Sequence, residues 1–242
     1  MYKHFALITL PLLCGVIARA APIACPTGTV QDYTTTVNAA GGCFEDGLLF
    51  TQFQYLSSSA GSGVALPASS VAVAPLVNAA GTGFGFQLSG GFAAAPNSVS
   101  DAILQYQIST INTQPLLSSV NLSFNGTFTG SGIANVSENY CPGGTVVPPG
   151  AGCNALSNIF VQTSNGGTML QSMAVFPGVS SLTVSKNIQV NGGTSGTATI
   201  SSVTNQFQTQ PIPEEPIPEP SAFLLLGSGL VGVAMVRRRL RP

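Results

Sequence analysis

The sequence predicts an all-β protein: a single antiparallel, sandwich-like β domain between two short terminal segments. Charged residues make up only 6% of the 242 residues, against about 25% in ordinary globular proteins, so few are present to cover the solvated faces of helices. The 28 glycines and 17 prolines suit short strands joined by turns. An apolar fraction of 44% with a net charge of −1 favours a folded domain, because disorder usually combines low hydrophobicity with high net charge.

Three segments alternate apolar and polar residues with the period of two that a strand requires. Their apolar faces are Leu104, Tyr106 and Ile108; Val120, Leu122 and Phe124; and Leu182, Val184, Ile188 and Val190. Lys186 falls on the third of these faces. We therefore expect that strand to lie at a sheet edge, or the lysine to reach solvent with its charged end.

Turn-forming residues bound these segments. Asn125-Gly126 predicts a turn, and Asn191-Gly192-Gly193 predicts a hairpin whose returning strand, 197–203, points Ala198 and Ile200 inward. Further strands are predicted at residues 48–55, 70–77, 84–88, 158–163 and 169–176. About nine strands at regular spacing fit an antiparallel sandwich.

Residues 1–20 have the order of parts of a secretory signal peptide. Lys3 and His4 form a short basic start, an apolar stretch follows, and Ala18-Arg19-Ala20 is an A-x-A cleavage site. We expect cleavage before Ala21, which leaves residues 21–209 as an extracellular β-rich domain. An uncleaved anchor is the alternative, although the apolar stretch is short for a membrane span.

The C-terminal segment joins three parts in order. Residues 210–220 form a proline-rich acidic linker that ends in Pro218-Glu219-Pro220, and residues 221–236 form an apolar run. The arginines that follow are Arg237, Arg238, Arg239 and Arg241. As a helix the apolar run spans roughly 24 Å, slightly less than a hydrocarbon core of about 30 Å. The positive-inside rule keeps the arginines cytoplasmic as a stop-transfer signal, which places the domain outside.

This order of Pro218-Glu219-Pro220, apolar run and arginine cluster resembles the PEP-CTERM sorting signal of bacteria that make exopolysaccharide. The resemblance covers only the C-terminal segment. It implies that exosortase, an integral-membrane cysteine transpeptidase, cuts the chain near the motif and passes it onward from the inner membrane. Residues 221–242 are then a transmembrane sorting helix with a basic tail, and a plain membrane anchor is the alternative.

Four cysteines remain in the chain after the predicted signal peptide: Cys25, Cys43, Cys141 and Cys153. An even number in an exported chain predicts two disulfides. Of the three possible pairings we favour Cys25–Cys43 and Cys141–Cys153, because each closes a local loop rich in glycine or proline. Each such loop adds about 3 kcal/mol of stability in the chain-entropy model. A metal site is the alternative, but no C-x-x-C spacing supports it.

The domain offers little for catalysis or nucleic-acid binding. The one histidine, His4, lies in the predicted signal peptide, so a Ser-His-Asp triad, a Cys-His dyad and a histidine-ligated zinc site are excluded. Glu45 and Asp46 are adjacent and would point to opposite faces of a strand. Lys186 is the one cation in residues 21–209; it has no companion motif for a Ser-Lys dyad and forms no basic patch for phosphates. We expect no catalytic residue, no metal and no cofactor.

These observations predict an exported, non-catalytic protein of the cell surface or extracellular matrix, associated with exopolysaccharide or biofilm. Its expected partners are exosortase and the inner membrane, both transiently. The second hypothesis is a carbohydrate-binding or adhesin module that contacts exopolysaccharide through exposed Tyr, Asn and Gln, although the chain has no Trp on which a sugar would stack. The third hypothesis is an enzyme with converging carboxylates.

Overall fold

The computed structural model describes residues 21–45, 47–77, 83–111, 115–144 and 157–210, which all belong to one unit of the chain, Met1–Gln210. The predicted signal peptide, the sorting helix and all but the first residue of the predicted linker lie outside these residues. Within the described ranges, no helix is long and apolar enough to cross a membrane.

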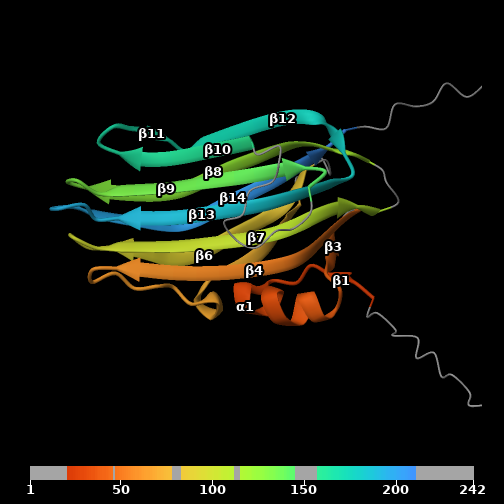
Figure 1. The fold of residues 1–242 in the computed structure, drawn as a ribbon, viewed down its shortest axis with the longest axis horizontal. Helices are drawn as coiled ribbons and strands as arrows, with labels where there is room; N and C mark the ends of the chain where they lie inside the picture. Colours follow the sequence, from red (N-terminus) through yellow and green to blue (C-terminus); the bar gives the residue numbers. More distant parts are fainter. Residues whose placement is uncertain (1–20, 46, 78–82, 112–114, 145–156, 211–242) are drawn as a thin grey trace, which may run out of the picture. The chain divides into compact units, whose positions relative to one another are not determined.

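The described strands form two sheets (Figure 1). Sheet A has the order β1 (Ile23–Ala24), β3 (Cys43–Glu45), β4 (Leu48–Ala60), β7 (Val99–Thr110), β13 (Ser181–Asn191), β9 (Ile133–Pro142), β10 (Ser157–Ser164) and β11 (Gly167–Met169). Sheet B has the order β12 (Gln171–Val179), β8 (Leu117–Thr129), β14 (Thr197–Thr209), β6 (Gly83–Ala94), β5 (Ala72–Val77) and β2 (Gly28–Thr29). Neighbouring strands are antiparallel, except that β1 runs parallel to β3.

The two sheets share one apolar core, so they pack face to face as a sandwich. Tyr106 and Ile108 of β7 in sheet A belong to the same buried cluster as Val203 and Phe207 of β14 in sheet B. The members of each pair lie an even number of residues apart, so they point to the same face of their strand. The predicted all-β, antiparallel sandwich is confirmed, and so are the inward positions of Ala198 and Ile200, each 1% exposed.

A short helical segment precedes the long strands. It consists of α1 (Val30–Asp32) and the π-helical turn η1 (Tyr33–Val37), and a single 3₁₀ turn, η2 (Ala68–Ser70), lies further along the chain. Thr29 and Asp32 form a reciprocal capping box at its start. Tyr33 and Val37 are buried in the core, which holds the segment against the sandwich. We did not predict this helix, because it is too short to show a helical period.

The turn predicted at Asn125-Gly126 is wrong, and so is the hairpin predicted at Asn191-Gly192-Gly193, although the chain does turn at residues 193–195. Strand β8 runs through Asn125-Gly126 without interruption, and its neighbour β14 absorbs an irregularity there, where the pairing shifts between Ile200 and Ser202. The residues from Asn191 to Gly193 do not close a hairpin, because β13 lies in sheet A and β14 in sheet B. Gly193 does take a positive φ, 61°, but the connection that contains it crosses between the sheets.

The predicted place of Lys186 is also wrong. Strand β13 is an interior strand that pairs with both β7 and β9, and Lys186 is only 1% exposed. It neither lies at an edge nor reaches solvent. The strand predicted at 169–176 is in fact two strands, β11 and β12, which belong to different sheets. Strand β9 was not predicted, since Glu138 interrupts the apolar face of Ala134, Val136 and Tyr140.

Candidate functional site

The sorting residues and part of the disulfide set lie outside the described residues. These are Pro218, Glu219, Pro220, Arg237, Arg238, Arg239, Arg241 and Cys153. The Cys25–Cys43 disulfide is present, with the two Cα atoms 4.7 Å apart, and it ties the residue directly after β1 to the first residue of β3. Cys141 is disulfide-bonded as well, but its pairing with Cys153 stays a prediction.

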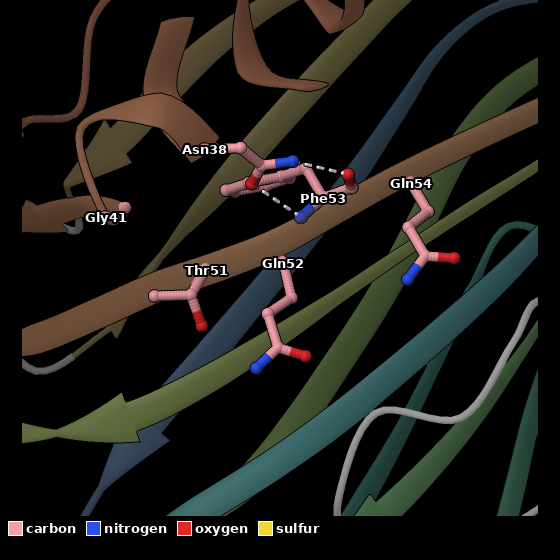
Figure 2. Close-up of a pocket in the computed structure, with 7 residues that line it drawn as sticks. Asn38, Gly41, Thr51, Gln52, Phe53 and Gln54 are labelled. Atoms are coloured by element: carbon pink, nitrogen blue, oxygen red, sulfur yellow. Dashed lines mark hydrogen bonds between the residues drawn. The ribbon is translucent and has the colours of Figure 1, made fainter. Parts of the chain in front are cut away.

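An open hollow of about 440 Å³ lies where the helical segment meets β4 (Figure 2). It is lined by Asn38, Gly41, Gly42, Thr51, Gln52, Phe53 and Gln54. The pairing of β4 with β7 shifts between Thr51 and Gln54, and Gln52 takes a φ of 58°. This irregularity turns the polar ends of Gln52 and Gln54 away from Asn38 in Figure 2.

Asn38 supplies the hydrogen bonds that the irregular part of β4 lacks. Its Nδ2 donates to the carbonyl oxygen of Phe53 at 2.8 Å, and its Oδ1 accepts from the amide nitrogen of Phe53 at 3.0 Å (Figure 2). The side chain thus replaces a neighbouring strand at this residue. The lining residues that the structure describes offer amides and hydroxyls, so the hollow can bind a polar ligand by hydrogen bonds.

A second polar site lies inside the sandwich. We call it the core cluster, and it consists of Tyr106 of β7, Glu138 of β9, Lys186 of β13 and Asn205 of β14. Each of the four is at most 1% exposed. Lys186 and Glu138 are directly opposed in the pairing of β13 with β9, whereas Asn205 reaches them from the facing sheet. Three strands of sheet A and one of sheet B therefore meet at this point.

Every polar group at the end of a side chain in the core cluster forms a hydrogen bond or an ion pair with another member. The Lys186 ammonium pairs with Oε2 of Glu138 and lies 3.0 Å from Oδ1 of Asn205. Nδ2 of Asn205 donates to Oε1 of Glu138 at 3.0 Å and to the carbonyl oxygen of Asn121 at 3.1 Å. The Tyr106 hydroxyl donates to Oδ1 of Asn205 at 2.5 Å.

The surroundings of the core cluster are apolar and aromatic. The Tyr106 ring stacks on Phe53 with centroids 5.4 Å apart and meets Phe86 and Phe207 edge-on. Loss of hydration lowers the pKa of Lys186, and the charge and hydrogen bond of Glu138 oppose that shift. Burial, with a smaller contribution from the charge of Glu138, raises the pKa of Tyr106, so its hydroxyl keeps the proton that it donates.

The sequence carried a signal for this cluster that we did not use. Lys186, Glu138 and Asn205 each occupy an inward position in an alternating strand, flanked two residues away by apolar side chains. A polar residue at such a position needs a partner inside the core. One such residue predicts little, but three of complementary chemistry predict a shared site.

The comparisons with known proteins identify the C-terminal segment. Residues 216–239 match the model of the PEP-CTERM protein-sorting motif, so the chain carries this motif and the predicted resemblance is confirmed. The motif implies export, a C-terminus anchored in the membrane before processing, and processing by exosortase. No curated protein matches the chain in sequence.

Several solved structures are similar to the domain at low identity. TmCBM61 in complex with beta-1,4-galactotriose is 9% identical with a TM-score of 0.30, over 62% of this chain and 86% of that one. The enzymatically active domain of tailspike protein 4 from bacteriophage CBA120 is 14% identical with a TM-score of 0.25, over 64% of this chain and 19% of that one. Endoglucanase 3 of family GH12 from Trichoderma harzianum is 12% identical with a TM-score of 0.22, over 66% and 98%. At these scores the likeness carries no argument about function.

Proposed function

We propose that this protein is a non-catalytic component of the cell surface or extracellular matrix, associated with exopolysaccharide or biofilm and delivered by exosortase. The observation that carries the proposal is the sorting motif at residues 216–239. The cleaved signal peptide that we expect at residues 1–20 would begin the same route. After exosortase cuts near Pro218-Glu219-Pro220, the β domain leaves the inner membrane.

The β domain has a feature that is typical of proteins outside the cell, a disulfide bond. Disulfides form and persist in oxidising compartments, and the Cys25–Cys43 bond closes the N-terminal part of the fold. Within the described ranges, no group of three or more His, Cys, Asp or Glu side chains is placed to hold a metal ion. The hollow beside Asn38 offers hydrogen-bonding groups, which supports a structural or binding role.

The sorting step is tested with Glu219→Ala in a bacterium that carries an exosortase. We expect the variant to stay uncut in the inner membrane, while the natural chain loses its arginine tail and leaves that membrane. Mass spectrometry of each cell fraction measures both outcomes. Glu214→Ala is the matched control, because it removes a carboxylate from the same proline-rich linker but outside residues 216–239. Equal processing of both variants, or an uncut natural chain, contradicts the proposal.

Carbohydrate binding is the second candidate function, and the hollow is the observation that favours it. Thr51, Gln52 and Gln54 offer hydroxyl and amide groups there, and such groups bind sugar hydroxyls. Phe53 is only 3% exposed, so it offers no free ring for stacking. Binding of the full chain to the exopolysaccharide of its host, reduced about tenfold in Gln52→Ala, would support this function. Equal binding of the natural chain and the variant to the polysaccharide would show that the hollow is not the binding site.

A further inference from the structure

The core cluster holds a primary amine, a carboxamide and a carboxyl group in mutual contact, and none of them reaches water. Lys186 is 1% exposed, Asn205 1% and Glu138 0%. Lys186 and Glu138 form the one ion pair found among the described residues. Nothing in a sorting or surface-binding role uses these groups.

Stability alone is a poor explanation for the cluster. Moving two charges out of water costs about as much as their attraction returns, and apolar residues of similar volume often stabilise a core as well or better. The rest of this core is built from such residues, among them Val184 and Ile188, which flank Lys186 on the same face. The arrangement of reactive groups therefore needs a chemical account.

We propose that Lys186 and Asn205 join in an intramolecular isopeptide bond that cross-links β13 of sheet A to β14 of sheet B. The amine of Lys186 is the nucleophile, the carboxamide carbon of Asn205 is the electrophile, and Glu138 is the general acid and base. Tyr106 is the group that stabilises the oxyanion.

The distances place each group for this role. Nζ of Lys186 lies 3.0 Å from Oδ1 of Asn205, and the reacting Cγ is bonded to that oxygen, about 1.2 Å from it. Groups held this close react as if at very high concentration. Because the amine and the amide come from facing sheets, only the folded sandwich brings them together.

Glu138 contacts both nitrogens that exchange a proton. Its Oε2 pairs with Nζ of Lys186, and its Oε1 accepts a hydrogen bond from Nδ2 of Asn205 at 3.0 Å. One carboxyl group can therefore take a proton from the attacking nitrogen and deliver a proton to the leaving nitrogen. The Tyr106 hydroxyl, 2.5 Å from Oδ1, donates to the oxygen on which negative charge develops.

The reaction balances without a further reactant. Proton transfer across the ion pair first gives the neutral amine of Lys186 and the neutral acid of Glu138. The amine attacks Cγ of Asn205, a new C–N bond forms, and the electron pair of the carbonyl moves to Oδ1. Glu138 gives its proton to Nδ2 and takes one from Nζ. The electron pair returns from Oδ1, the carbonyl re-forms, and the bond from Cγ to Nδ2 breaks. The departing ammonia takes the remaining proton from Glu138 and leaves as ammonium, which returns Glu138 to the carboxylate of the starting ion pair.

The apolar surroundings favour bond formation by supplying neutral amine and by excluding water. Desolvation lowers the pKa of Lys186, which increases the share of neutral amine. The aromatic rings around Tyr106 exclude water, so hydrolysis does not compete with attack by the amine. Ammonia is small and soluble, and its escape makes the bond permanent.

The natural full chain, purified after export, is sufficient for a direct test. After denaturation and reduction, chymotrypsin cuts behind Leu182 and Phe207, and the peptide 183–207 between these sites contains both Lys186 and Asn205. We expect this peptide to be lighter than its sequence by one ammonia molecule and to resist trypsin at Lys186, because trypsin needs a free amine. A peptide of full mass that trypsin cuts at Lys186 overturns the proposal. Succinimide formation at Asn191-Gly192 also releases ammonia, but it leaves Lys186 open to trypsin.

The role of Glu138 is tested with Glu138→Gln, which keeps the size of the side chain and removes its acid–base function. We expect the bond to form at least about 100-fold more slowly, as followed by the trypsin-resistant fraction of peptide 183–207 after a pulse of synthesis. Glu45→Gln in β3 is the matched control and should link at the natural rate. Linking at the natural rate in Glu138→Gln overturns the role of Glu138. If that variant does not fold, the mass of the natural chain still decides whether the bond exists.

Discussion

Tyr55 shows how burial of one polar side chain couples the fold to pH. Its hydroxyl donates to the carbonyl oxygen of Leu66 at 2.8 Å, and burial raises its pKa to about 12, although a hydrogen bond with Ser57 opposes the shift. The folded protein thus holds this proton more tightly than the unfolded chain does. The resulting stability is complete below the unfolded pKa of about 10 and is lost as the pH rises toward about 12.

Tyr55→Phe should therefore flatten the loss of stability at alkaline pH. We expect the free energy of unfolding to fall less between about pH 9 and pH 12 in the variant than in the natural protein. Urea denaturation across that range measures the two slopes. Tyr106 and Tyr33 also have a raised pKa, so some slope remains in the variant. Parallel curves for the two proteins would show that Tyr55 does not contribute.

At the scale of single elements, the irregular part of β4 depends on the helical segment. The backbone of Phe53 cannot pair with β7, since the register shifts between Thr51 and Gln54, and Asn38 takes over both of its hydrogen bonds. The Cys25–Cys43 disulfide closes the loop that contains the helical segment. The short helical segment and the irregular part of β4 therefore stabilise each other.

Asn38→Ala should destabilise the domain by about 1–3 kcal/mol, because it leaves the amide and carbonyl of Phe53 without partners. Thermal or urea denaturation measures the change. Gln31→Ala in α1 is the matched control, since this side chain is exposed, and it should change stability by less than about 0.5 kcal/mol. An equal, small effect of both substitutions would show that water replaces Asn38 at the edge of the hollow.

At the scale of the whole molecule, the proposed isopeptide bond lies close to the C-terminal end of the β domain. The sorting motif follows this end in the sequence. Strand β14 ends at Thr209, four residues after Asn205, and the proline-rich linker begins next. Tension on the C-terminus, before or after transfer, would reach Lys186 in the interior of sheet A directly through the bond. A surface protein that is pulled by its tail would then resist loss of its last strand.

Stretching single molecules between the N-terminal end of the β domain and Thr209 tests this mechanical role. The 18 residues between Lys186 and Asn205 cannot extend when the bond is present, so full unfolding should release about 60 Å less chain than in Lys186→Met. Both proteins keep the Cys25–Cys43 disulfide, which makes them a matched pair. Equal released lengths would show that no covalent bond spans these residues.

The sequence by itself determined the sorting motif, the β class of the domain and the inward faces of several strands. Each of these depends on neighbouring residues: the motif is contiguous, and alternation is a property of one strand. The sequence also allowed the Cys25–Cys43 pairing to be chosen, because the two cysteines close a short loop. The places of β13 and β14 in different sheets were not predicted, since a glycine-rich connection can close a hairpin or cross between sheets equally well.

Only the tertiary structure decided which residues meet in the core cluster. Glu138, Lys186 and Asn205 come from three strands, and their contact depends on the register of β9 with β13 and on the packing of sheet A against sheet B. A one-residue slip of any of these strands would turn its side chain to the other face. Strand pairing and sheet packing join residues that are distant in the sequence, so no local sequence pattern predicts them. The reactive site is therefore a property of the assembled sandwich.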